Sequence, residues 1–164
     1  MTAYQTVRVV AAILERAGTV FVARRDKDRS SGGLWEFPGG KVEPGEAPKE
    51  ALHQELREEL AVEASIGDFV DRNWTSVNGE PLKMTCYAAT LAGSGPERST
   101  DHDAMRWVRL DQLLSLNWAP ADIPIIERLP QSLRATGVTP AYTAGLAMGD
   151  LDAPQADHAS RANQ

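Results

Sequence analysis

Three glutamates stand close together in the segment GGKVEPGEAPKEALHQELREELAV, residues 39–62. If residues 47–60 form a helix, Glu55, Glu58 and Glu59 fall within a sector of about 100° on its surface. The leucines that recur at every fourth position fall in the adjacent sector and predict a buried stripe. The carboxylates are therefore expected at the edge of that stripe, where the helix meets the rest of the fold.

Such a group of carboxylates repels itself unless a positive charge lies among its members. Each like-charged pair three or four residues apart on a helix destabilises it by roughly 0.2–0.5 kcal/mol, and this cost rises near a low-dielectric core. A divalent cation removes the cost, and Mg²⁺ prefers oxygen ligands and shares its shell with water and phosphates. A solubilising surface, or pairing with Arg57 and Lys49, is the alternative. Because all three glutamates share one sector after a glycine-rich turn, we favour a metal site.

The same segment resembles the Nudix box, whose pattern is G-x5-E-x7-R-E-U-x-E-E-x-G-U, with U an apolar residue. Gly40 begins the pattern, Glu46 occupies its first acidic position, and the three clustered glutamates occupy the others. Two positions depart from it, because Gln54 replaces Arg and Ala61 replaces Gly. The resemblance extends to LWEFPGGKVEPGE and NWAPADIPIIERL and covers roughly residues 7–133. Within the family, the chain is similar to the MutT-type and CTP-pyrophosphohydrolase branch.

This resemblance implies a fold, a reaction and a set of ligands. The expected fold is a Nudix-type α/β/α sandwich with a mixed β-sheet between helices. Nudix proteins hydrolyse a nucleoside diphosphate linked to another moiety, and this branch converts a nucleoside triphosphate and water to the monophosphate and pyrophosphate. Glu55, Glu58 and Glu59 would bind Mg²⁺ or Mn²⁺, with the Gly39 carbonyl as a further ligand. Glu55 instead, or in addition, would orient or deprotonate the attacking water.

The resemblance also points to residues around the phosphates. An acidic residue just before a His often supplies a further ligand or base in this branch, and Asp101 precedes His102 here. A loop-solvating aspartate is an equally weighted alternative. Lys41 is expected to meet the departing pyrophosphate. Gln54 can donate hydrogen bonds but lacks the charge and planar fork of Arg, so we expect reduced activity that Gln54→Arg raises. Ala61 would affect stability only, if it adopts a left-handed conformation after the helix.

Three residues are expected at the base and sugar end of a nucleotide. Asp122, in WAPADIP, stands where related enzymes place an Asn or Asp that reads the base edge. Its carboxylate suits the N4 amino group of cytosine, although the N1 and N2 protons of guanine would also satisfy it, and a helix N-cap is a compatible interpretation. Phe37 resembles a base-contacting aromatic, with core packing equally weighted. Arg25 is expected to meet the phosphate or sugar, with a surface arginine as the alternative.

The match around Asp122 favours CTP, dCTP or 5-modified dCTP as substrate. The alternative enzyme removes oxidised purine triphosphates, above all 8-oxo-dGTP. A hypothesis of another class is a Nudix module that binds nucleotides without turnover, because the box carries Gln54 and Ala61. The three intact glutamates argue against that class. An ADP-ribose or dinucleotide hydrolase fits less well, since the region around Asp122 matches the triphosphate branch better.

The remaining elements must position these residues. Apolar residues 7–14 and 19–23 predict a β-hairpin or two neighbouring strands with both faces covered. Asn78-Gly79 predicts a tight turn between strands at residues 69–77 and 82–91. A second helix is expected over residues 122–129, with Pro130 stopping or kinking it. Further short elements are expected at residues 34–38, 62–66, 105–108 and 110–116.

The whole chain has 164 residues and suggests one domain, residues 1–135, followed by an Ala/Gly/Pro/Asp-rich and mobile tail, residues 136–164. Its net charge of −6 argues against a nucleic-acid polymer as partner. The single Cys86 excludes an internal disulfide and a multi-cysteine zinc site. Neither a signal peptide nor a transmembrane span is recognisable, so we expect a cytoplasmic monomer or homodimer that has a nucleoside triphosphate substrate and no membrane partner.

Overall fold

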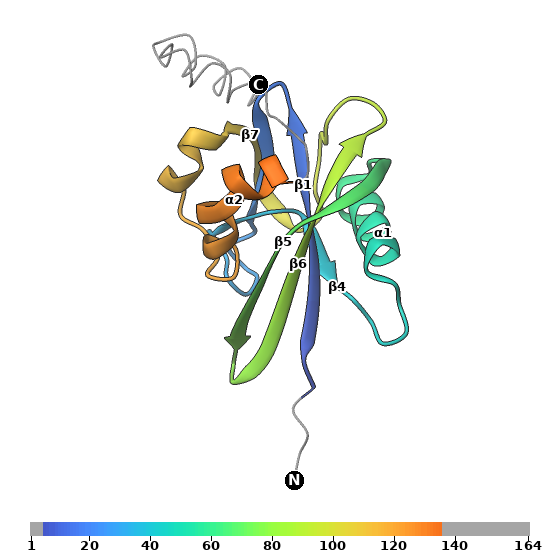
Figure 1. Ribbon diagram of the computed structural model, residues 1–164, viewed down its shortest axis with the longest axis vertical. Helices are drawn as coiled ribbons and strands as arrows, with labels where there is room; N and C mark the ends of the chain where they lie inside the picture. The colour runs from blue at the N-terminus through green and yellow to red at the C-terminus, as the bar shows by residue number, and fades with distance from the viewer. Residues whose placement is uncertain (1–4, 136–164) are drawn as a thin grey trace.

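The computed structural model describes residues 5–135, in which a mixed β-sheet lies between helices (Figure 1). The helices are α1 (Pro48–Leu60) and α2 (Ile123–Ala135), and a 3₁₀ helix, η1 (Leu110–Ser115), precedes α2. The strands are β1 (Val7–Arg16), β2 (Thr19–Arg25), β3 (Trp35–Glu36), β4 (Gly39–Lys41), β5 (Ala64–Val77), β6 (Glu80–Leu91) and β7 (His102–Arg109). This is the predicted α/β/α sandwich. No helix within residues 5–135 is long and apolar enough to cross a membrane. The predicted tail lies outside the described residues.

Strand β1 is the centre of the sheet. It runs parallel to β6 and antiparallel to β4. Its pairing with β2 is confined to two residue pairs beside the turn, Glu15↔Val20 and Arg16↔Thr19. Beyond them the two strands separate, and β2 pairs instead with β3 and β7. The two predicted arrangements were a β-hairpin and two neighbouring strands. The structure shows two strands that pair only beside their tight turn and then lead into different parts of the sheet.

Residues along β1 alternate between two cores, because successive side chains of a strand point to opposite faces. Val10, Ala12 and Leu14 pack with the leucine stripe of α1. Ala11 and Ile13 pack on the other face, with the buried side chains of α2. The unbroken apolar run in the sequence therefore reflects a strand that is covered on both sides, as Figure 1 shows.

Strands β5 and β6 form the predicted hairpin. Asn78 and Gly79 both have positive φ, 52° and 80°, which is the backbone conformation that a two-residue type I′ turn requires. Strand β5 is longer than expected, because residues 62–66 and 69–77 were predicted as separate strands. Two register shifts between Ile66 and Asp71 absorb the irregular part of the sequence and keep one strand continuous.

Helix α2 does not stop at Pro130, contrary to one of the two predicted outcomes. A proline inside a helix removes one backbone hydrogen bond, yet α2 continues to Ala135. Leu129 and Leu133 on either side of the proline are 0% and 1% exposed, so burial favours a further helical turn. Arg128 also pairs with Asp71 of β5 at 2.8 Å and fixes the helix against the sheet.

Candidate active site

The two glycines of β4 bring its backbone against the α1 carboxylates. A Cβ atom at Gly40 would lie 2.5 Å from the Glu55 carboxyl carbon, and one at Gly39 would lie 1.9 Å from the Val10 carbonyl oxygen. Neither position can accept a side chain without displacing its neighbours. The glycines therefore allow the β4 main chain to lie directly beside Glu55.

The structure brings Asp101 from the loop before β7 to the α1 carboxylates, because its side chain and that of Glu59 are hydrogen-bonded. Burial, this hydrogen bond and the nearby negative charges raise the pKa of Glu59 to about 9. The bond from Glu59, together with Arg29 at 2.7 Å, lowers the pKa of Asp101. Glu59 is thus the protonated donor and Asp101 the ionised acceptor at neutral pH.

Glu55 and Glu58 complete the cluster. Burial and the charge of Glu58 raise the pKa of Glu55. Glu58 is exposed and accepts a 2.8 Å hydrogen bond from the Gln54 amide. The first acidic position of the box, Glu46, accepts a hydrogen bond from the backbone N–H of Glu43. Gln54 therefore orients Glu58 in this chain.

The cluster can be tested for its fit to a divalent cation. Within residues 5–135, no three or more His, Cys, Asp or Glu side chains are arranged in the structure so that they could hold a metal ion. Glu58 is turned toward Gln54, and Glu59 meets Asp101 through a proton. The donor set nevertheless suits Mg²⁺, because it consists of carboxylate oxygens. Burial and, to a smaller extent, neighbouring negative charge raise the pKa of both Glu55 and Glu59, and a cation would offset that negative charge.

A pocket of about 460 Å³ lies beside β4 and extends to the loop before α2. Its lining includes the three residues predicted for the base and sugar end, together with Lys41 at the exposed rim. Asp122 is 4% exposed, and its Oδ1 accepts a 3.1 Å hydrogen bond from the backbone N–H of Phe37. Burial raises the pKa of Asp122 to about 8. The residue directly precedes α2, as an N-cap would, but its carboxyl group bonds to Phe37.

Phe37 and Arg25 both line this pocket, and each is held by a neighbour. Phe37 is 2% exposed, and its ring packs against Trp118 at a centroid distance of 5.2 Å. The packing expected as its alternative role is therefore present. Arg25 pairs with Glu36 at 2.9 Å and donates to the Ser30 carbonyl. Its guanidinium group is thus oriented before any ligand arrives.

Sequence reasoning missed Glu36, which lies between the two ends of the site. Its charge contributes to the raised pKa of both Glu59 and Asp122. The structure also places the Nε2 atom of His102 3.5 Å from Glu36, a neighbour that the sequence did not indicate. A charged residue between Trp35 and Phe37 in a buried strand was the available signal. Its partners could not be recognised, because they come from distant parts of the chain.

Comparison with known proteins agrees with this geometry. Residues 4–129 match the family model described as the NUDIX domain. The chain belongs to the Nudix family. This Nudix protein is 40% identical over 129 residues to the CTP pyrophosphohydrolase of Escherichia coli K12, covering 79% of this chain and 94% of that one. It is 38% identical over 131 residues to the putative 8-oxo-dGTP diphosphatase 2 of Mycobacterium tuberculosis H37Rv, covering 78% and 91% of the two chains.

Solved structures show the same Nudix architecture. The solution structure of the E. coli ORF135 protein aligns with a TM-score of 0.68 and 38% identity, covering 80% of this chain and 93% of that one. The MutT protein of Methanosarcina mazei Go1 aligns with a TM-score of 0.72 at 22% identity, which shows the fold alone. The chain is therefore a Nudix hydrolase that acts as a nucleotide pyrophosphohydrolase. Nudix hydrolases generally use divalent metals such as Mg²⁺, and the carboxylate cluster fits such an ion.

Proposed function

We propose that this Nudix hydrolase converts (d)NTP and water to (d)NMP and pyrophosphate with Mg²⁺, and that it favours CTP, dCTP or 5-modified dCTP. The observation that carries the base preference is the buried Asp122 carboxyl group at the pocket. One of its oxygens is fixed by the Phe37 N–H, so the other is available to a base edge. The 40% identity with a CTP pyrophosphohydrolase supports the same substrate class.

The reaction assigns a task to each part of the site. Glu55, Glu58 and Glu59 would hold the cation with the Gly39 carbonyl. The cation would neutralise phosphate charge and lower the pKa of a bound water. Glu55 would orient or deprotonate the attacking water.

Residues around the cluster would complete the site. Asp101 would take up the Glu59 proton as its hydrogen-bond partner, or contribute a further ligand. Lys41 would meet the outgoing pyrophosphate and Arg25 the phosphate or sugar. Phe37 would contact the base through the edge that borders the pocket.

An alternative substrate is 8-oxo-dGTP, which the 38% identity with a putative 8-oxo-dGTP diphosphatase favours. The N1 and N2 protons of guanine can both donate to an ionised Asp122. A binding module without turnover is the alternative of another class, because Gln54 stands in the box. The three intact glutamates argue for the enzyme, because burial and their mutual repulsion raise the pKa of Glu55 and Glu59 and a bound metal would offset that repulsion.

The deciding experiment measures pyrophosphate release with Mg²⁺ from CTP, dCTP, 5-methyl-dCTP, 8-oxo-dGTP and dGTP. We expect the highest kcat/KM with a cytidine-type triphosphate, and activity at least about 100-fold lower in Glu59→Gln because a charged ligand is lost. Asp122→Asn should change the ranking of bases more than kcat. A preference for 8-oxo-dGTP would establish the alternative substrate, and nucleotide binding without any turnover would establish the binding module.

A further inference from the structure

One face of the β5–β6 hairpin carries cations and aromatic rings side by side. Strand register places Arg8 of β1 level with Lys83 of β6, and Lys83 opposite Trp74 of β5. These three side chains share one face, because paired residues on neighbouring strands point the same way. Farther along the same face lie Arg72 and the pair Phe69↔Tyr87. We call this set of residues the cation–aromatic face.

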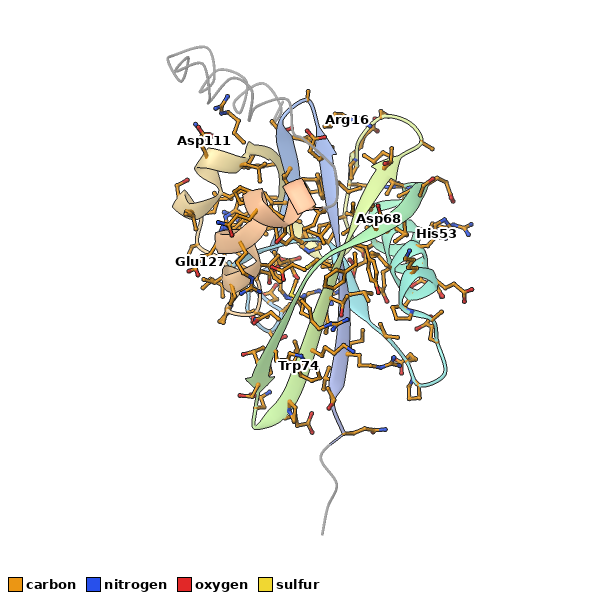
Figure 2. The ribbon with its side chains drawn as sticks, in the orientation of Figure 1. Arg16, His53, Asp68, Trp74, Asp111 and Glu127 are labelled. Atoms are coloured by element: carbon orange, nitrogen blue, oxygen red, sulfur yellow. The ribbon has the colours of Figure 1, made fainter. Side chains whose placement is uncertain are left out.

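The cation–aromatic face lies on the side of the sheet that α1 partly covers. Val10 and Ala12, which alternate with Arg8 along β1, pack under that helix. The hairpin extends beyond α1, and Figure 2 shows Trp74 on this projecting part. Trp74, on this part, is 60% exposed, and Phe69, at the register shift farther along β5, is 45% exposed, so both rings are open to solvent.

The cations of this face lack acidic partners. Arg8, Arg72 and Lys83 form no ion pair within residues 5–135, and the same holds for Lys49 at the start of α1. Several other arginines of the domain are paired with carboxylates. Glu80, near the turn, shares the opposite face with Val77, its register partner. The cation–aromatic face thus gathers three cations that form no ion pair within residues 5–135, although Arg8 donates to the Glu43 carbonyl oxygen, on a protein whose net charge is −6.

Each of these aromatic rings is in contact with one of the cations. Lys83 lies 5.6 Å from the Trp74 ring centroid, Arg72 5.2 Å from that of Phe69, and Lys49 5.6 Å from that of Tyr87. Contacts of this kind hold a charged group beside a flat apolar surface. Two of these ring–cation pairs lie on the hairpin itself, and the cation of the third comes from α1.

The cation–aromatic face is separate from the active-site pocket. Thr75, Leu82 and Met84 alternate with its residues along the same two strands, and these three line the pocket on the other face of the sheet. A ligand on the cation–aromatic face would therefore leave the pocket open, and its binding does not depend on which nucleotide the pocket accepts.

We propose that the cation–aromatic face binds single-stranded nucleic acid. Grooves or faces that bind single strands combine positive charge, which follows the phosphates, with aromatic rings on which bases stack. This face presents cations from β1, β5 and β6 and aromatic rings from β5 and β6. An anionic membrane would be met by the same cations, but the rings stand on a pleated sheet face among charged groups and form no apolar helix side that could enter a bilayer. The acidic net charge of the whole chain, which argued against a nucleic-acid partner, conceals this local concentration.

The test uses the full-length protein and a fluorescein-labelled 12-residue oligouridylate with a 5′-hydroxyl, so that no triphosphate can enter the pocket. Fluorescence anisotropy is measured in EDTA between 20 and 200 mM salt. With about four phosphates contacted, log K should fall against log salt with a slope of about −3. Arg72→Gln/Lys83→Gln should reduce that slope by about 1.4. Trp74→Ala should weaken binding roughly tenfold without changing the slope, and Trp74→Phe should restore most of it.

Matched controls separate this face from general charge and from misfolding. Lys27→Gln/Arg98→Gln removes two exposed cations that form no ion pair among the described residues, and it should leave the oligonucleotide affinity unchanged. Leu114→Ala is the matched control for Trp74→Ala, because it removes an apolar side chain on η1 that is 68% exposed, and it should leave the affinity unchanged. All variants should hydrolyse nucleoside triphosphate like the wild type. Equal losses in the control variants, or absence of oligonucleotide binding, overturn the proposal. If Arg72→Gln/Lys83→Gln loses binding to vesicles with 30% phosphatidylserine but still binds the oligonucleotide, the face binds membranes, and the proposal is overturned.

Discussion

Glu59 and Asp101 share a proton within the carboxylate cluster for which we propose a cation. The free protein stabilises its carboxylates in two ways, by protonating Glu59 and by pairing Asp101 with Arg29. Neither device offsets the added negative charge of a triphosphate. If the cluster binds a divalent cation as proposed, the cation would displace the proton of Glu59.

At the same scale, Asp122 predicts a pH dependence that distinguishes the two candidate bases. With a pKa of about 8, Asp122 is neutral at pH 7 and can accept from cytosine N4 while donating to N3. Above pH 8 it becomes an acceptor only, which suits the N1 and N2 protons of guanine. The KM for CTP should therefore rise between pH 7 and pH 9, and the KM for 8-oxo-dGTP should fall. Steady-state kinetics with both substrates at each pH measures this.

Asp122→Asn provides the control, because an amide offers one acceptor and one donor but does not titrate. The variant should show flat KM profiles over the same range. Parallel profiles for the wild type and the variant would mean that another group titrates.

Gln54 predicts a gain of activity. Its amide holds Glu58 through a neutral hydrogen bond of 2.8 Å, whereas an arginine would hold the same carboxylate through a stronger, charge-assisted bond. Gln54→Arg should raise kcat/KM several-fold, measured as pyrophosphate release at saturating Mg²⁺. Gln54→Lys adds the charge without the planar fork and should give a smaller gain. An unchanged or lower kcat/KM in Gln54→Arg would show that the glutamine is already compensated.

At the scale of elements, the end of α1 stores backbone strain. Ala61 has φ 54° and ψ 38°, and its N–H bonds to the Arg57 carbonyl. This is the left-handed cap that glycine occupies most easily. Ala61→Gly should raise the free energy of unfolding by about 1 kcal/mol, measured by urea denaturation. Ala51→Gly, a buried helix-interior control on α1, should lower it, so a loss in both variants would contradict the cap argument.

Local patterns predicted some elements well and others poorly. The leucine spacing predicted α1, and Asn78-Gly79 predicted the β5–β6 turn, because both signals act over a few residues. The separation of β1 from β2 depends on β6 and β7, which lie far away in sequence. Likewise α2 continues past Pro130 because Leu133 is buried by the sheet. At the site, the motif predicted the α1 glutamates, whereas Glu36 depended on contacts made only in the folded chain.

At the scale of the whole molecule, two carboxyl groups with raised pKa values, Glu59 and Asp122, lie at different ends of the site. The Glu59 cluster lies on the α1 side and Asp122 precedes α2, with Glu36 close enough to raise the pKa of each carboxyl. Both groups hold protons in the folded protein that an unfolded chain would release. The stability of the domain is therefore coupled to pH through the residues to which we assign metal and base binding.

This coupling predicts how stability changes with pH. The folded pKa values of Glu59 and Asp122, about 9 and about 8, lie above their ordinary values of 4.5 and 3.8. Between these limits the folded state binds more protons than the unfolded state, so the free energy of unfolding falls as pH rises. For Asp122 alone the slope is at most about 1.4 kcal/mol per pH unit. Urea denaturation in EDTA from pH 5 to pH 9 should show this decline.

Mg²⁺ should reduce the fall in the free energy of unfolding above pH 7. The cation takes the place of the Glu59 proton, so it binds more tightly as that proton leaves. Isothermal titration in buffers of different ionisation enthalpy should show about one proton released per cation at pH 7.5, since Glu59 is then still protonated. Glu59→Gln should abolish both the release and the protection by Mg²⁺. If the cation stabilises the variant as strongly as the wild type, Glu59 is not its ligand, and the metal binds elsewhere on the protein.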